Sequence, residues 1–417
     1  MLWGRCIVLI LRFSVNSNVA THQLAVAPSA RRFSGLQHNP STRLLLQKSS
    51  RQQAPDVHVN PRRHLHPLFV LLAQKLIKGV AILTGRGFRK WWISLPPNKR
   101  QRFAQQLRNN RGKITIGLGI TGGLAAAYYV THLQRTPITN RLRFIAFNDD
   151  QMRKITEFQN ELEVQQLKMA FCQINHPYVC RVKAVAERLL EGNRDLPQIH
   201  DKTWTVCVVN TPQQNAFVLP NGHIYVFRGM IDLCHTDDEL GCIIAHEMAH
   251  AVLNHCAENM SHAHFIDFCV ILLLAGLWAV MPSDGIAVIT QWFFNKVIDL
   301  MLHLPYSRKL ETEADIVGLE LAAKACFDIR HSSTFWIKMA MMRELKNQEE
   351  IPEFLSTHPA DETRGERLDA QMADALKKRL ECQCPPLPPR DPRLMIAGLR
   401  HQIKAAKNGS RKLPKMA

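Results

Sequence analysis

The hydrophobic pattern marks out two apolar regions in this chain. Residues 114–130 (ITIGLGITGGLAAAYYV) carry no charge, and 17 such residues are at the short end of what crosses a bilayer as a helix. Residues 265–280 and 286–304 are also apolar, and the Met-Pro-Ser-Asp between them is typical of the turn in a helical hairpin. The hairpin 265–304 either inserts into the membrane or packs into a protein core, because Asp267, Lys296 and Asp299 interrupt the two apolar runs.

Mixed periodicity from residue 149 onward predicts a folded domain that is long enough to bury a core. The expected elements are helices at 155–171 and 177–192, strands at 203–209, 215–219 and 223–228, and further helices to residue 381. A Pro-rich segment at 384–392 closes the domain, and the basic tail at 401–417 is expected to be loosely ordered. The expected fold class is α+β, predominantly helical with a small sheet, over residues 149–400, preceded by the transmembrane helix.

Residues 66–92 are apolar but carry a basic residue every few positions. This spacing suits a helix that lies on an anionic membrane face, such as one containing cardiolipin, better than a helix that crosses the bilayer. We therefore expect residues 66–110 to form a basic amphipathic segment on the membrane surface. Gly119 and Gly123 in the following span have the spacing of a helix-pairing motif, which leaves a homo-oligomer open.

The positive charge is concentrated near the start of the sequence. Residues 1–148 hold 23 Lys and Arg against one acidic residue, Asp56, so a nucleic-acid-binding surface spread over the fold is not expected. The Arg- and Ser-rich leader in residues 1–65 is typical of a mitochondrial transit peptide, and the alternative, a secretory signal, lacks a clear cleavage site. Residues 94–113 contain six Lys/Arg and residues 131–150 contain three. This bias predicts that the segment before the span lies in the matrix and the folded domain in the intermembrane space.

Residues 246–250 read His-Glu-Met-Ala-His. On a helix, His246 and His250 lie one turn apart on the same face and can hold one metal ion between them. Glu247 is too far round the helix to share the ligand set comfortably, but it is well placed to take a proton from the attacking water. Residues 236–239 (Thr-Asp-Asp-Glu) form a capping box, so the motif lies in a helix that begins properly. The pattern predicts a zinc peptidase site.

A catalytic zinc ion usually takes three protein ligands. His255 lies about 140° round the same helix and is expected to face away. The helical stretch 307–326 places Glu311 and Asp315 on one face and turns Glu313 to the other side. We therefore expect Glu311 to be the third ligand and Asp315 to accept the free ring N–H of a ligand histidine. Glu313 is expected to be dispensable.

The chain contains eleven cysteines, of which only Cys382 and Cys384 lie close together. A lone Cys-x-Cys is weak evidence for a metal finger, so most of the cysteines are expected to be small buried residues. Some could form disulfides in the intermembrane space, and Cys326 is the candidate among them for redox control of the site.

Four stretches carry a family resemblance: NAFVLPNGHIYVFRG (215–229), HEMAHAVLNH (246–255), PYSRKLETEAD (305–315) and STHPADETR (356–364). In this order they resemble the gluzincin family that includes the CAAX prenyl endopeptidase and a bacterial heat-shock membrane protease. Finer matches over residues 65–400 resemble the mitochondrial inner-membrane members, whose activity overlaps that of the m-AAA protease.

The resemblance implies a donor to the oxyanion in the STHP segment, for which His358 is the candidate; a histidine that caps a helix is the alternative. It also implies that the NAF strand receives substrate as an added strand, with Asn215, Ala216 and Phe217 binding its main chain. The implied substrates are membrane proteins cleaved in quality control and under stress, including the inner-membrane dynamin-like GTPase, with one zinc ion per chain.

Two non-catalytic functions remain open. One is a zinc-binding scaffold or holdase, and the other is a membrane-anchored adaptor in which the His-Glu-Met-Ala-His motif has no role. Glu247 favours hydrolysis over the scaffold, because proteins that have lost an enzymatic activity tend to lose the base. A metal assay together with a cleavage assay separates all three functions.

Overall fold

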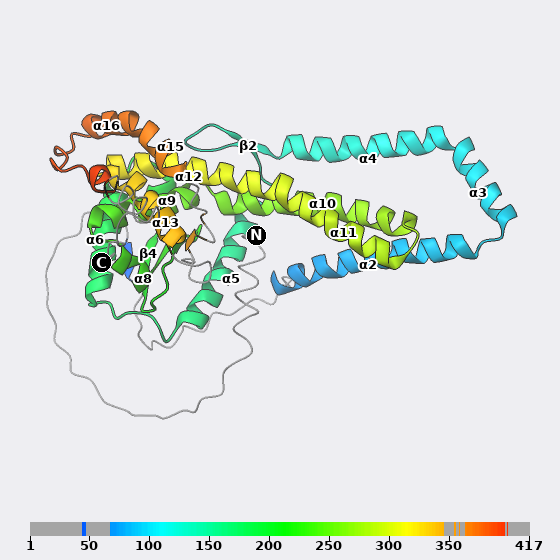
Figure 1. Ribbon diagram of the computed structural model, residues 1–417, viewed down its shortest axis with the longest axis horizontal. Helices are drawn as coiled ribbons and strands as arrows, with labels where there is room; N and C mark the ends of the chain where they lie inside the picture. The colour runs from blue at the N-terminus through cyan, green and yellow to red at the C-terminus, as the bar shows by residue number, and fades with distance from the viewer. Residues whose placement is uncertain are drawn as a thin grey trace, which may run out of the picture.

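The computed structural model describes residues 44–46, 67–345, 354–355, 358, 363–396 and 398. Figure 1 shows a folded body at one end of the long axis and several long helices that extend from it in one direction. The α+β, predominantly helical fold class is confirmed.

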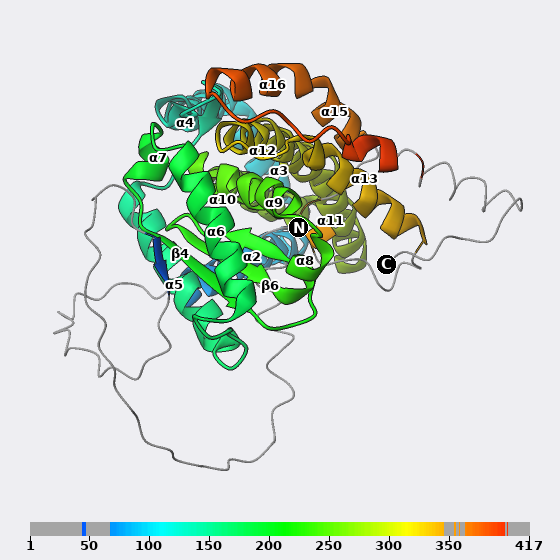
Figure 2. The same ribbon diagram turned by 90° about the vertical axis from the view of Figure 1, so that its left-hand side faces the viewer.

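The body is built around a four-stranded sheet with the order β1 (Leu44–Leu46), β4 (Trp204–Val209), β6 (His223–Phe227) and β5 (Ala216–Val218). The first three strands are parallel, and β5 runs antiparallel to β6 at the edge. The three strands predicted between 203 and 228 are therefore confirmed. Every residue of β4 is buried, because helices cover the sheet (Figure 2).

Two long helices of the body precede β4 in the chain. α5 (Asp149–Leu167) begins earlier than the predicted residue 155, because the Asn148 side chain accepts from the Gln151 amide and the Gln151 side chain accepts from the Asn148 amide. α6 (Pro177–Gly192) has the predicted bounds. In the described residues, the body also contains α7 (Pro197–His200), α8 (Arg228–Leu233), α9 (Asp237–Val252), α12 (Leu304–Lys324), α13 (Arg330–Leu345), α15 (Arg364–Ala370) and α16 (Met372–Glu381).

The extended helices include the predicted span and the predicted hairpin. They are α2 (Pro67–Ser94), α3 (Pro97–Asn109), α4 (Arg111–Thr131), α10 (His255–Val280) and α11 (Asp284–Ile298). A short antiparallel pair, β2 (Leu133–Arg135) and β3 (Leu142–Phe144), connects α4 to the body. Among the described residues, three helical segments are long and apolar enough to cross a membrane: Arg111–Thr131, His255–Val280 and Asp284–Lys324.

The hairpin formed by α10 and α11 is not part of the buried core of the body. Large apolar side chains on both helices are exposed, among them Leu273 (71%), Ile289 (68%) and Trp292 (61%). Aqueous solvent would make such a surface unfavourable, so exposed apolar helices of this length need an apolar environment. A π-helical turn, Asp299–His303, joins α11 directly to α12.

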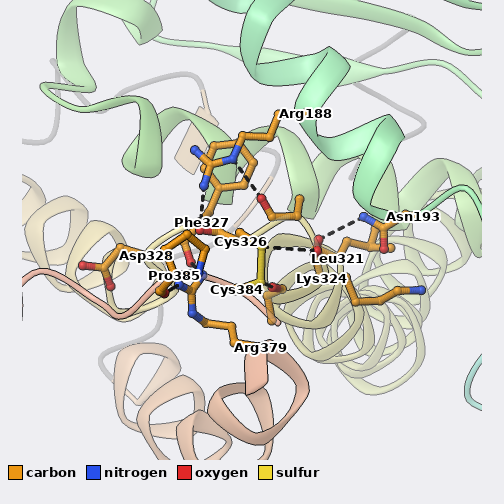
Figure 3. Close-up of a disulfide and its surroundings, with 12 residues drawn as sticks. Arg188, Asn193, Leu321, Lys324, Cys326, Phe327, Asp328, Arg379, Cys384 and Pro385 are labelled. Carbon is orange, nitrogen blue, oxygen red and sulfur yellow. Dashed lines mark hydrogen bonds between the residues drawn. A yellow bond between two sulfur atoms is a disulfide. The ribbon is translucent and has the colours of Figure 1, made fainter. Parts of the chain in front are cut away.

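A disulfide links the end of α12 to the segment after α16. Figure 3 shows Cys326 bonded to Cys384, with a Cα–Cα distance of 5.2 Å. Arg188 donates to the carbonyl oxygens of Ala325 and Cys326 and lies 3.9 Å from the centre of the Phe327 ring. The redox role expected for Cys326 stays a prediction, but this cysteine has a specific partner.

We expect replacement of both Cys326 and Cys384 by Ala to lower the free energy of unfolding by about 4 kcal/mol, since the bond closes a loop of 58 residues. Unfolding in urea, followed in detergent, measures the change. The matched control is Cys382→Ala, which removes an exposed free thiol two residues away. Equal stability of the control and the double variant would contradict the prediction.

Candidate metal centre

The His-Glu-Met-Ala-His residues lie on α9, a helix that is buried along nearly all of its length. The side chain of Thr236 accepts a hydrogen bond from the Glu239 amide at 3.1 Å, as the capping box predicts. The reciprocal bond differs from the expectation, because the Glu239 carboxylate accepts from the amide of His235 at 2.7 Å. Three acidic residues in the first turn also favour this helix start.

A glycine allows α12 to approach α9 closely at the centre of the site. A Cβ added at Gly318 would lie 2.8 Å from the Cα of His246, so a larger residue would push the two helices apart. Glu311 lies two turns before Gly318 on α12, and the close approach brings its carboxylate to the histidines.

Four side chains converge at this point. His246 Nε2 and His250 Nε2 are 3.2 Å apart. The Glu311 carboxylate places one oxygen 3.5 Å from His246 Nε2 and the other 3.6 Å from His250 Nε2. His358 completes the group, and the ligand atoms of all four residues lie within 4.8 Å of one another. The structure thus brings together the three predicted ligands, although their role in metal binding stays a prediction.

His358 bridges the ligand group and Glu247. Its Nδ1 lies 3.0 Å from Glu311 Oε2, and its Nε2 lies 3.3 Å from Glu247 Oε1. Glu247 is itself buried, with 3% of its surface exposed, and it is outside the convergent group. This placement suits a proton acceptor next to a metal ion, and it leaves His358 free to act as a hydrogen-bond donor or as a further ligand.

Asp315 lies where the sequence predicted a partner for a ligand histidine. Its Oδ1 is 3.1 Å from His246 Nδ1, on the side of the ring that faces away from the ligand group. Arg364 was not predicted. It donates to both oxygens of Asp315 at 2.6 and 2.7 Å, lies 3.1 Å from Glu311 Oε2 and stacks over the Trp336 ring at 3.4 Å. It ends the STHPADETR stretch, which was the only sequence signal for it.

The expectation that His255 faces away is wrong. Asn254 adopts a left-handed conformation (φ 54°), so α9 ends at Val252 and His255 begins a new helix that turns back toward the site. His255 Nδ1 lies 3.0 Å from His250 Nδ1, and its Nε2 lies 3.3 Å from Glu313 Oε2. His255 therefore contacts the His250 ring at Nδ1, whereas Nε2 of that ring faces His246.

Glu313 is outside the group around His250, as the helical phase predicted, but it is not a solvated residue. It is buried, and it accepts a hydrogen bond from Arg141 Nε at 2.8 Å. Arg141 also donates to both oxygens of Glu258, at 2.7 and 2.8 Å. The expectation that Glu313 is dispensable is revised, because it holds His255 and, through it, His250.

Burial and neighbouring charges shift the pKa values of the α9 residues. Burial alone would lower the pKa of His246, but hydrogen bonds to Asp315 and Glu311 outweigh it and raise that pKa to about 9. Burial lowers the pKa of His250 well below its usual value and raises the pKa of Glu247. The two imidazole nitrogens and the carboxylate converge closely enough to hold one metal ion, and this donor set is one that zinc prefers. The residues present therefore fit a zinc ion.

The predicted substrate strand lies at the sheet edge. Ala216 pairs with Val226 and Phe217 pairs with Tyr225 across the β5–β6 ladder, which leaves the other side of β5 without a neighbouring strand in the described sheet. Asn215 is buried, and its carbonyl oxygen accepts from Phe227. The binding of a substrate main chain to this edge stays a prediction.

The fold and the donor set define the class of protein, a metallopeptidase of the HExxH type. The sequence profile of Peptidase family M48 matches residues 180–372, which include α9 and α12. The mitochondrial metalloendopeptidase OMA1 of Danio rerio is 38% identical to this chain, over 86% of the chain and 78% of the relative. The chain therefore belongs to peptidase family M48, and the predicted gluzincin resemblance is confirmed.

Other relatives extend this similarity. The mitochondrial metalloendopeptidase OMA1 of Bos taurus is 41% identical over 81% of this chain and 65% of the relative. The chain thus spans slightly less than two thirds of the bovine protein. The mitochondrial metalloendopeptidase OMA1 of Schizosaccharomyces pombe is 31% identical over 68% of this chain and 78% of the relative.

Proposed function

We propose that this chain is a zinc-dependent endopeptidase of the mitochondrial inner membrane, with one zinc ion per chain and the catalytic domain in the intermembrane space. The convergence of His246, His250 and Glu311 beside a buried Glu247 is the observation that carries the proposal. The names of the relatives support a mitochondrial metalloendopeptidase.

A zinc ion held by His246, His250 and Glu311 would polarise the attacking water and the scissile carbonyl group. Glu247 accepts the proton of the attacking water and returns it to the leaving amine. His358, which lies 3.3 Å from Glu247, donates a hydrogen bond to the developing oxyanion. Asp315 holds the His246 ring in one orientation through Nδ1, and Arg364 in turn holds the Asp315 carboxylate through two hydrogen bonds.

The edge of β5 suits an extended peptide as substrate. Binding by an added strand uses main-chain hydrogen bonds, so Asn215, Ala216 and Phe217 would impose little sequence preference. We propose membrane-anchored proteins as the substrates, cleaved in quality control and under stress. The inner-membrane dynamin-like GTPase is included on the basis of the family resemblance alone.

Two observations support the orientation. The Lys/Arg bias around α4 favours a matrix location for the residues that precede it. The Cys326–Cys384 disulfide favours a compartment in which thiols are not kept reduced, since disulfides are rare in reducing compartments.

We expect a metal chelator to abolish cleavage of an unstructured peptide by the purified protein in detergent, and added zinc to restore it, because three of the four convergent side chains are zinc ligands in this proposal. Peptide cleavage and zinc content are measured on the same samples. A protein that binds zinc and cleaves nothing would instead support the zinc-binding scaffold or holdase.

We expect external protease to spare the catalytic domain in intact mitochondria and to digest it once the outer membrane is ruptured. The domain is followed by blotting, with a matrix protein as the control for an intact inner membrane. Survival of the domain until detergent is added would place it in the matrix and contradict the proposed orientation.

A further inference from the structure

The helix α2 packs along α10 through small side chains. A Cβ added at Gly85 would collide with the carbonyl oxygen of Ala275 and would lie 2.8 Å from the Cβ of Trp278. Ala81, one turn earlier, is buried, so the two residues form a small-xxx-small pair at the contact. Close packing of this kind is typical of helices that associate inside a bilayer.

Three basic residues of α2, Lys78, Arg86 and Arg89, turn toward the hairpin. Lys78 forms an ion pair with Asp267 on α10 at 2.7 Å. Farther along, Arg86 and Arg89 both pair with Asp284 at the start of α11, the former at 2.6 Å, and Arg89 also donates to a carbonyl oxygen of the hairpin turn. Basic residues of α2 are thus neutralised by acidic residues that lie about 190 positions later in the sequence.

The outward face of α2 is apolar. Leu76 (65%), Val80 (60%) and Leu83 (65%) are exposed, as are the apolar residues of α10 and α11. A helix that lies on a membrane surface instead turns its charged side chains toward water and its apolar side chains toward the lipid. Charges turned inward and apolar side chains turned outward are what a bilayer requires of a helix that it surrounds.

We propose that α2 is a membrane-spanning helix that forms a three-helix transmembrane unit with α10 and α11, and that the bilayer covers the shared apolar surface. Residues 67–85 contain only two charged residues, Lys75 and Lys78, and 19 helical residues are enough to cross the hydrocarbon core. Arg86, Arg89 and the Trp pair that follows then lie at the matrix interface, where basic and aromatic residues are enriched.

The arrangement of the helices has a topological consequence. Figure 1 shows α2 running away from the body beside α10, α3 at the far end and α4 returning toward the body. Two spans, α2 and α4, therefore lie between β1 and the rest of the body, so the start of α2 at Pro67 lies on the same side of the membrane as the catalytic domain, in agreement with the pairing of β1 and β4 in the sheet. This inference extends the membrane part of the proposed function and does not depend on peptidase activity.

Cysteine accessibility in mitoplasts tests this topology. His66→Cys, just before α2, and Gln101→Cys, exposed on α3, are placed separately in a chain whose Cys6, Cys180 and Cys382 are replaced by Ser. We expect a membrane-impermeant maleimide to label His66→Cys without detergent and Gln101→Cys only with detergent. Asp201→Cys, exposed on the body, reports the side of the catalytic domain. Protection of both His66→Cys and Gln101→Cys, with Asp201→Cys labelled, would show that α2 lies on the matrix side of the membrane and would overturn the inference.

An exchange of charges tests the packing of α2 on α10. We expect Lys78→Asp and Asp267→Lys each to lower the yield and the thermal stability of the detergent-extracted protein, and the double variant to recover both. Failure of the double variant to exceed the poorer single variant would overturn the pairing. Peptide cleavage by the same preparations tests the peptidase separately, so the two proposals can fail independently.

Discussion

Replacement of Glu247 by Gln will stop peptide cleavage while the bound zinc remains. The amide has nearly the same volume as the carboxylate but cannot accept the proton of the attacking water. Glu247 is outside the convergent ligand group, so the donors from α9 and α12 stay in place. General-base catalysis is worth about 10²–10⁴-fold, and loss of water activation as well should bring the residual rate near the limit of detection.

The measurement combines cleavage of an unstructured peptide with zinc quantified by emission spectroscopy on the same purified protein. Glu320→Gln, a half-exposed position on α12 that pairs with Lys378, is the matched control and should cleave normally. A Glu247→Gln protein that keeps its zinc and cleaves at more than about a tenth of the wild-type rate would remove the general-base role, because even a weak base is worth more than that.

Local sequence patterns were sufficient to identify three of the side chains that converge at the candidate site. The four-residue spacing of His246 and His250 and the helical phase of Glu311 depend only on the geometry of an α-helix, which is the same in every protein. The pattern could not show that Gly318 lets the two helices meet, because that contact depends on how α9 and α12 pack.

The contacts around the site depend on single residues whose effect the hydrophobic periodicity does not predict. One left-handed residue, Asn254, ends α9 and redirects His255 onto the ring of His250, whereas an uninterrupted helix would turn it away. Arg364 also reaches Asp315 and Glu311 only because α15 packs against α12. Such contacts join residues that are far apart in the sequence, so local periodicity does not predict them.

The membrane helices illustrate the same limit. The basic residues of α2 predict a surface helix when the segment is read alone. Asp267 and Asp284 pair with three of these residues, and in the sequence the two aspartates only interrupt an apolar hairpin. When the helices lie side by side, the basic residues of α2 neutralise the acidic residues of the hairpin. The sequence alone does not show that these residues are paired.

The order in which three carboxylates on α12 affect zinc binding should be Glu311, then Glu313, then Glu320. Glu311→Gln replaces a ligand oxygen and also removes the partner of His358, 3.0 Å away. Loss of an outer contact typically lowers metal affinity about 10–100-fold, so loss of the ligand itself should exceed about 100-fold. Competition with a chromophoric chelator measures each affinity directly, without any need for activity.

Glu313→Gln should fall between the other two, with zinc affinity lower by about tenfold. The neutral amide weakens the ion pair with Arg141 and the contact with His255, which supports the ring of His250. His255→Ala should have a similar effect, and combining it with Glu313→Gln should add little, because both changes release the same ring. A Glu313→Gln protein that loses more zinc than Glu311→Gln would show that helical phase identified the wrong ligand, whereas zinc binding equal to that of Glu320→Gln would show that His250 is oriented without help from His255.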